Sequence, residues 1–388
     1  MKTTRILSAV LLGLLASACS KPDLSNLPDV TQTITCPDDP AMEPPEDPAA
    51  GGPWTVGVRT VAISNRNKAD LTADIWYPAT TGSDAGMAPE VYDLRQFLPD
   101  KDAALIPDGS GLVQPCDCYR DLPIDFANGP YPVIVFVHGT ASFRTASLKQ
   151  MTHWASRGFI VISADNPKIQ LRDLKANPLG SVFATQAQDT VQILEAVHGL
   201  NDDLVDFHNA IDPTRIGLGG HSAGARAVTE LGAAPGVRVI ISMAGSGGDI
   251  DNTYARRAMF IGSELDSVSR YRNTLSGFNS AQLPKRLVGI ANTGHLTYTE
   301  LCSLGAEFGG VIPLVKSYGV DVPPLFLALG TDGCGPEFLD PQTGWDVVNY
   351  ASTIAYEELL QCKPGLGDQF PAIVDRYGDA ILETDEQL

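Results

Sequence analysis

Basic side chains are scarce in this 388-residue chain, in which 27 lysines and arginines face 46 aspartates and glutamates. The formal net charge of -19 argues against nucleic acid as a partner, because a nucleic-acid binder needs a basic face to neutralise phosphates. It also argues against attraction to anionic lipid surfaces. The chain is 44% hydrophobic, which is enough to bury a full globular core under a solvated acidic surface.

Long apolar runs are missing too, and the run at residues 6–16 is too short to span a bilayer. Lys2 and Arg5 precede it and small residues lead into Cys19, so residues 1–18 predict an export signal. This segment resembles a bacterial lipoprotein signal, which implies that Cys19 carries lipid. With Ser20 following, the resemblance implies anchoring at the cell envelope, in the outer membrane. An ordinary secretory signal cut near Ala18 is the alternative, and either signal exports the chain.

Cysteine pairs with the spacing of a zinc ribbon are absent, and no histidine lies near the CDC at 116–118. We therefore expect no metal and no cofactor. Export places the remaining cysteines in an oxidising compartment, so up to three disulfides are expected, with 15 possible pairings left open. A disulfide at Cys302 would restrain the nearby segment of His295. The six cysteines are Cys36, Cys116, Cys118, Cys302, Cys334 and Cys362.

Composition divides the exported chain. Residues 19–53 are rich in proline and acids, which predicts an extended tether. Residues 54–388 predict one α/β domain that begins with an antiparallel strand pair. Residues 79–129 are too long for a simple connection and predict an insertion packed over the domain, with cysteines available to fasten it. Residues 303–388, with an amphipathic stretch at 347–360, predict a helical appendix.

Short apolar runs alternate with amphipathic segments after residue 130, and helical spacing is clear in "FATQAQDTVQILEAVHGL". Continuous apolar strands that alternate with helices predict a mostly parallel sheet covered on both faces. The predicted strands of this region lie at residues 133–139, 159–165, 215–220, 238–245, 258–264 and 286–292.

The motif "GHSAG" joins the strand at 215–220 to the helical "ARAVTELGA". A G-x-S-x-G sequence between strand and helix predicts a sharp turn that raises the serine above the carboxyl edge of the sheet, where ligands bind. Gly220 and Gly224 would allow strand and helix to approach closely. Ser222 is therefore the candidate nucleophile. The alternative is a close strand-to-helix turn of small residues that has no catalytic role.

A serine needs a general base, and His295 is the only histidine downstream of Ser222. It follows the last predicted strand, at the carboxyl edge. The acid that orients the imidazole should lie between them in the chain. Asp266 follows the preceding strand and is preferred, and Glu264 and Asp249 are its rivals.

The oxyanion that develops during acyl transfer needs two backbone donors. One is Ala223, directly after the nucleophile. The other comes from the loop "HGTAS" after the strand at 133–139, where Thr140 is preferred and Ala141 is the alternative.

The stretches "DIWYPA", "GPYPVIVFVHGTASFRTA", "DPTRIGLGGHSAGA" and "GHLTYTEL" resemble, in this order, α/β-hydrolases of the dienelactone hydrolase-like group. They are also similar to platelet-activating factor acetylhydrolases and cutinase-like polyester hydrolases. The resemblance covers residues 54–300 and implies Ser222, Asp266 and His295 as the triad. Dienelactone hydrolases use a cysteine nucleophile where this chain has Ser222, so lactone specificity does not carry over.

Together these features predict a serine hydrolase that cleaves small or polymeric carboxylic esters through an acyl-enzyme. A polyester hydrolase or a phospholipid-acyl hydrolase is the alternative within enzymes. The alternative from another class is a catalytically inactive hydrolase fold that serves as an extracellular binding module.

Overall fold

The computed structural model describes residues 21–35, 42–66, 68–179 and 185–388. The predicted signal at 1–18, the predicted lipidation site Cys19 and the cysteine Cys36 lie outside these residues. Within the described ranges, no helix has both the length and the apolar character needed to cross a bilayer.

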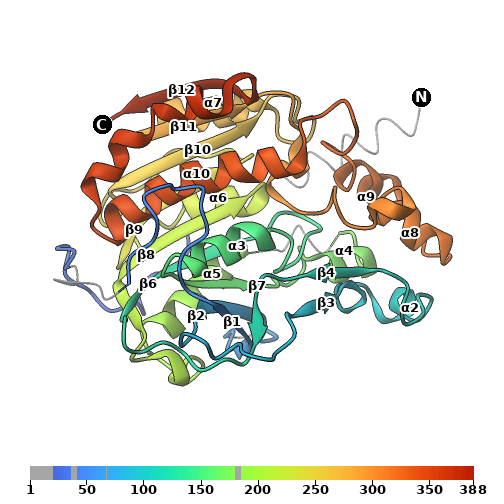
Figure 1. The fold of residues 1–388 in the computed structure, drawn as a ribbon, viewed down its shortest axis with the longest axis horizontal. Coiled ribbons are helices and arrows are strands. Elements are labelled where there is room, and N and C mark those ends of the chain that lie inside the picture. The colour runs from blue at the N-terminus through green and yellow to red at the C-terminus, as the bar shows by residue number, and fades with distance from the viewer. Residues whose placement is uncertain (1–20, 36–41, 67, 180–184) are drawn as a thin grey trace.

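A central sheet holds ten of the described strands, in the order β12-β11-β10-β9-β8-β6-β7-β2-β1-β5 (Figure 1). Strands β7, β6, β8, β9, β10 and β11 are mutually parallel, as the buried apolar runs predict. Strands β1 and β2 form the predicted antiparallel pair. The bounds are β1 Val56–Ile63, β2 Leu71–Pro78, β5 Tyr119–Arg120, β6 Tyr131–Val137, β7 Ile160–Ala164, β8 Ile211–His221, β9 Val237–Met243, β10 Arg257–Ser263, β11 Lys285–Ile290 and β12 Ile381–Gln387.

Helices cover both faces of this sheet. On one face lie α3 (Leu148–Ser156), α10 (Pro341–Leu360) and α11 (Ala372–Tyr377). On the other lie α5 (Gln186–Val197), α6 (Ala223–Thr229) and α7 (Tyr271–Ser280). Glycines of β8 shape the first interface, because a side chain at Gly217 would come within 2.6 Å of the Tyr356 ring on α10. The shorter helices are η3 (Val205–Phe207), η4 (His295–Tyr298), η5 (Ala306–Phe308), η6 (Pro364–Gln369) and η7 (Gly378–Ala380).

The C-terminal segment is not purely helical, which corrects the prediction for 303–388. After α11 the chain forms β12, which pairs antiparallel with β11 at the edge of the sheet. Its burial alternates little and its sequence, "ILETDEQ", is mostly polar, so neither hydrophobic periodicity nor strand propensity marks it. This segment is a strand because it pairs with β11, whose outer edge has no other neighbour among the described strands.

The insertion at 79–129 divides into two parts. Strand β5 adds to the sheet next to β1, and residues 91–115 form the hairpin β3 (Val91–Asp93) and β4 (Val113–Pro115), with η1 (Leu94–Phe97) and α2 (Asp100–Ala103) between them. The disulfide Cys116–Cys118 is internal to the insertion and does not fasten it to the domain.

Ion pairs fasten the insertion instead. Helix α4 (Leu171–Ala176) holds α2 through Arg172–Asp100 and Lys175–Asp102, each at 2.6 Å. Helices α8 (Val311–Ser317) and α9 (Pro324–Leu329) lie on the same side of the molecule as α2 and β3 (Figure 1). We call residues 91–113 and 301–329 together the cap, because their apolar side chains form one hydrophobic cluster.

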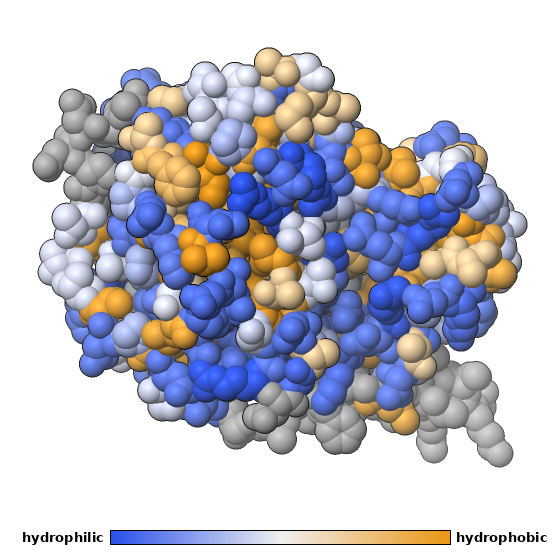
Figure 2. Space-filling model, turned by 90° about the horizontal axis from the view of Figure 1, so that it is seen from below, coloured by the Kyte–Doolittle hydropathy of each residue, from blue (hydrophilic) through white to orange (hydrophobic). Residues whose placement is uncertain are grey.

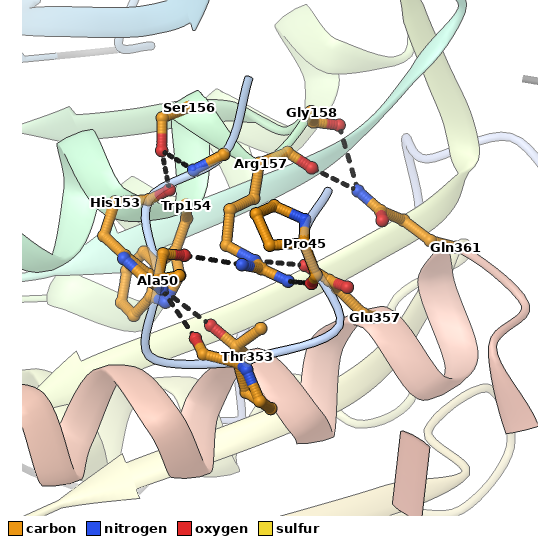
Figure 3. Close-up of polar contacts among 12 residues, drawn as sticks. Pro45, Ala50, His153, Trp154, Ser156, Arg157, Gly158, Thr353, Glu357 and Gln361 are labelled. Carbon is orange, nitrogen blue, oxygen red and sulfur yellow. Dashed lines mark hydrogen bonds and ion pairs between the residues drawn. The ribbon is translucent and has the colours of Figure 1, made fainter. Parts of the chain in front are cut away.

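Residues 42–53 do not form a free tether, which corrects that prediction. Figure 3 shows this segment around the guanidinium of Arg157, which donates hydrogen bonds to the carbonyl oxygens of Pro45, Asp47 and Ala50 at 2.9, 3.1 and 2.5 Å. Arg157 is fully buried and paired with Glu357 of α10 at 2.5 Å. A buried guanidinium needs acceptors, and the proline-rich backbone supplies them. We call residues 42–53 the N-terminal strap.

The surface is mostly polar on the face that Figure 2 shows. Apolar side chains lie on this face in small groups. Scattered apolar residues of this kind are normal for a soluble surface.

Candidate active site

Ser222 sits on a strained turn between β8 and α6. Its φ of 58° and ψ of -116° place a non-glycine residue in a sparsely populated region. The turn needs its two glycines, because a Cβ atom at Gly220 would lie 2.4 Å from the backbone of Gly224. A Cβ atom at Gly224 would lie 2.0 Å from the carbonyl oxygen of Val137 in β6. Close packing of strand and helix therefore holds the serine at the carboxyl edge of the sheet.

His295 faces this serine from the loop after β11. Its Nε2 atom lies 2.9 Å from the Ser222 hydroxyl oxygen, and its Nδ1 atom lies 2.7 Å from Oδ2 of Asp266. Asp266 follows β10, the neighbour of β11, so the topology brings the two loops together. The other oxygen of Asp266 accepts hydrogen bonds from the backbone of Val268 and Ser269 at 2.8 and 2.6 Å, which fixes the carboxylate.

The two rival acids point elsewhere. Glu264 is exposed and accepts a hydrogen bond from the backbone of Asn292 at 2.9 Å. Asp249 is exposed in the loop after β9. Of the three carboxylates, Asp266 is therefore the one that the structure brings to His295.

His221 supports the site from inside the turn. Its Nε2 atom lies 2.9 Å from the carbonyl oxygen of His295, and the two rings are 4.6 Å apart. Complete burial, followed by the proximity of His295, lowers the pKa of His221 well below its usual value. His221 therefore stays neutral and donates to His295 as a hydrogen-bond partner.

The loop after β6 lies against Ser222, because a Cβ atom at Gly139 would come within 3.0 Å of the serine Cβ. The backbone N–H of Ala141 donates to the carbonyl of Ile169 at 2.9 Å, so it is already committed. Thr140 precedes it and lines the same pocket as Ser222. Arg144 anchors the loop to Asp165. The backbone N–H and the guanidinium of Arg144 donate hydrogen bonds to the Asp165 carboxylate at 2.8 and 2.6 Å.

An apolar pocket opens beside Ser222 and runs beneath the cap. Of the described residues that line it, Lys175 is the sole lysine, arginine, aspartate or glutamate, and its ammonium is paired with Asp102. The described lining is thus largely aliphatic and aromatic, with the hydroxyl residues Thr140, Ser142 and Thr299 and no unpaired carboxylate or ammonium. The apolar lining includes Leu94, Leu98, Leu112, Phe143, Leu171, Val311, Ile312, Val315, Val320, Val322, Phe326 and Leu329.

Asp332 is a residue of the site that the sequence did not reveal. It lies between α9 and α10, and its Oδ1 atom accepts a hydrogen bond from the backbone N–H of His295 at 2.6 Å. Its Oδ2 atom accepts from the backbone and the hydroxyl of Ser267. Apart from the nearby Cys334, no motif marks this aspartate, because its role depends on a loop that returns to the site from 37 residues further along the chain.

The chain has the α/β-hydrolase fold. Its coordinates superpose on a ferulic acid esterase from Streptomyces cinnamoneus with a TM-score of 0.58 and 17% sequence identity, over 83% of this chain and 94% of the esterase. Residues 45–168 match the family described as platelet-activating factor acetylhydrolase, isoform II. That match ends before Ser222. A comparison with curated protein sequences finds no match.

Proposed function

We propose that this protein is a serine hydrolase that cleaves carboxylic esters through an acyl-enzyme. The continuous hydrogen-bonded chain from Ser222 through His295 to Asp266, at 2.9 and 2.7 Å, carries this proposal. Both distances are within the reach that a nucleophile and its base require. A strained serine costs folding free energy, which a passive binding module would have no reason to retain.

In the proposed mechanism, His295 removes the proton of the Ser222 hydroxyl as its oxygen attacks the ester carbonyl carbon. Asp266 keeps the imidazole in the required tautomer and stabilises the imidazolium. His295 then protonates the departing alcohol. A water molecule, activated by the same base, attacks the acyl-enzyme and releases the acid and the free serine.

The oxyanion of each tetrahedral intermediate is assigned to the backbone N–H groups of Ala223 and Thr140. Ala223 opens α6, so the positive end of the short helix also faces the site. The hydrogen bond from Ala141 to Ile169 favours Thr140 over Ala141 as the second donor.

The pocket favours an ester with an uncharged, apolar acyl or alcohol group. Burying a charged group against these aliphatic side chains would cost free energy without a partner to offset it. Apolar esters include polyester segments and the acyl chains of phospholipids, the two alternatives that the sequence leaves open.

Labelling with a fluorophosphonate tests the proposal. We expect the wild-type protein to form a covalent adduct at Ser222 and the Ser222→Ala variant to form none, with hydrolysis of p-nitrophenyl esters lost in parallel. A wild-type protein that neither labels nor hydrolyses any ester would instead support an inactive binding module. A chain-length series of esters, followed by phospholipid vesicles and polyester films, identifies the substrate class.

We also propose that the protein is exported and anchored to the cell envelope by lipid on Cys19. The Cys302–Cys334 and Cys116–Cys118 disulfides support an oxidising compartment. Metabolic labelling with a palmitate analogue should mark the wild-type chain and not Cys19→Ala. Unlabelled wild type, cut near Ala18, would indicate an ordinary secretory signal instead.

A further inference from the structure

Asp332 joins the two loops that carry the acid and the base of the site. Its carboxylate accepts the backbone N–H of His295 on one oxygen, and the backbone N–H of Ser267, next to Asp266, on the other, at 2.6 and 3.2 Å. Its backbone carbonyl accepts the N–H of Leu296 at 2.9 Å. Three backbone donors from two separate loops therefore converge on one residue.

The contact is close because the two segments of the chain have glycines, Gly294 and Gly333, where they cross. A Cβ atom at Gly294 would lie 2.4 Å from the Cα atom of Gly333, and one at Gly333 would lie 2.9 Å from the Cα atom of Gly294. Gly333 has a φ of 98°, a conformation that disfavours other residues. The sequence at both positions thus permits the approach that brings Asp332 to the backbone of His295.

A disulfide holds this crossing in place. Cys334, two residues after Asp332, is bonded to Cys302, seven residues after His295. The bond ties the segment of Asp332 to the segment that follows the histidine. The backbone of His295 is also held from the nucleophile turn, because its carbonyl oxygen lies 2.9 Å from Nε2 of His221.

We propose that Asp332 is a positioning residue for His295 and Asp266, and that the Cys302–Cys334 disulfide keeps it in register. This inference rests on the proposed serine-hydrolase function. Asp332 touches no reacting atom; it fixes the separation of the two loops, on which the hydrogen bond between imidazole and carboxylate depends. A displacement of about 1 Å in such a site can cost 100-fold in rate.

The test compares Asp332→Ala with Asp340→Ala. Asp340 lies on the same segment and caps α10 by accepting the N–H of Thr343, without contacting either loop. For Asp332→Ala we expect kcat for a p-nitrophenyl ester to fall by about 10- to 100-fold, with KM within about threefold of wild type. Asp340→Ala should keep the wild-type kcat, although it also loses a hydrogen bond.

Two further measurements separate positioning from folding. The low-field proton resonance of the His295–Asp266 hydrogen bond should shift or broaden in Asp332→Ala and persist in Asp340→Ala. Asp332→Asn retains one acceptor oxygen but turns an amide N–H toward donors of one loop, so its kcat should lie between those of wild type and Asp332→Ala. Asp332→Asn serves as the main variant if the alanine variant does not fold.

The disulfide enters through a double-mutant cycle. We expect Cys302→Ser with Cys334→Ser to lower kcat, and adding Asp332→Ala to that variant to lower it less than in wild type, because both changes disrupt one contact. A folded Asp332→Ala or Asp332→Asn variant with wild-type kcat and resonance overturns the inference. If Ser222→Ala retains hydrolysis, the proposed function fails instead, whatever the Asp332 variants show.

Discussion

At the scale of single residues, the site is built from groups with few alternatives. Ser222 is held at a positive φ because strand and helix leave no other course for the chain. His295 is held through its side chain by Asp266 and through its backbone by Asp332 and His221. These contacts fix the imidazole in place, which is the preorganisation that the proposed mechanism requires.

The triad should behave as one unit. Because Ser222 and His295 act in the same proton transfer, each alanine substitution should lower kcat by roughly 10⁴- to 10⁶-fold, and the double variant should be scarcely worse than either single one. Steady-state kinetics with a soluble ester measure this. Losses that multiply in the double variant would contradict the shared mechanism.

The acid can be tested separately. Replacing Asp266 by Asn keeps the shape but removes the charge that stabilises the imidazolium, so kcat should fall about 10⁴-fold. Glu264→Gln and Asp249→Asn are the matched controls and should stay within roughly tenfold of wild type, because neither carboxylate contacts His295. If Asp249→Asn were the crippling change, our assignment of the acid would be wrong.

Glu300 predicts a pH dependence of stability. It is buried, and desolvation raises its pKa to about 7 even though Gln114 and the backbone of Lys149 donate hydrogen bonds to it. The unfolded carboxyl has the ordinary pKa of 4.5. The folded state therefore binds the proton more tightly, and this contribution to stability is full below pH 4.5 and is lost as pH rises through 7.

Glu300→Gln should remove that dependence. Relative to wild type, the variant should gain up to about 3 kcal/mol of unfolding free energy between pH 5 and pH 8. Urea denaturation at the two pH values measures the difference. Asp117→Asn is the control, since its exposed carboxylate pairs with Lys149 at 2.6 Å and should change little. An equal response of the two variants would refute the role of Glu300.

At the scale of elements, the N-terminal strap is held by two arginines whose ion pairs differ in burial. Arg157 and Glu357 are almost inaccessible, whereas Arg376 and Asp47 are each 42% exposed. Arg157→Ala leaves the Glu357 carboxylate with Lys363 alone and removes the guanidinium donor from three strap carbonyls, of which the Asp47 carbonyl keeps the N–H of Ala50. We expect it to lower the unfolding free energy by roughly 3 to 5 kcal/mol.

Arg376→Ala is the matched control, because Arg376 of α11 pairs with Asp47 of the same strap. An exposed pair contributes 1 kcal/mol at most, roughly, because solvent screens it. Chemical denaturation of both variants should therefore separate them clearly. Similar losses would mean that burial of the Arg157 pair does not govern the attachment of the strap.

The cap should set the size of the acyl or alcohol group. Leu98 lines the pocket from the insertion, so Leu98→Trp should narrow it and lower kcat/KM for a long-chain ester by at least roughly 10-fold. The acetyl ester should be hydrolysed nearly as in wild type. Leu105→Trp is the control, because Leu105 is exposed on the same insertion. An equal loss for acetyl and long-chain esters in Leu98→Trp would contradict this role of the cap.

At the scale of the whole molecule, two segments far apart in the sequence, residues 91–113 and 301–334, complete the site whose central residues the sheet positions. The sheet positions Ser222, Asp266 and His295 at one edge. Residues 91–113 and 301–329 then enclose the apolar pocket, and residues 331–334 fix the histidine loop. The similarity to acetylhydrolases at 45–168 covers only the first of these segments.

The sequence by itself determined the parallel sheet and the residues at its carboxyl edge. Buried parallel strands are short continuous apolar runs, and a G-x-S-x-G turn needs its two glycines within five residues of chain, so both leave local patterns. The positions of Asp266 and His295 follow from strand order, which chain order nearly reproduces here.

Only the tertiary structure decided the parts that depend on contacts across the chain. The N-terminal strap is proline-rich and acidic, a composition that predicts a free tether. It is held in place because its backbone carbonyls accept hydrogen bonds from the buried Arg157 guanidinium. Strand β12 is polar and exists because β11 offers it an edge. Asp332 reaches the histidine loop because the chain segments at Gly294 and Gly333 cross closely. The Cys302–Cys334 disulfide is one of many cysteine pairings that the sequence left open. Long-range hydrogen bonds leave no periodic signal in a sequence, because their partners are brought together by the fold and not by spacing along the chain.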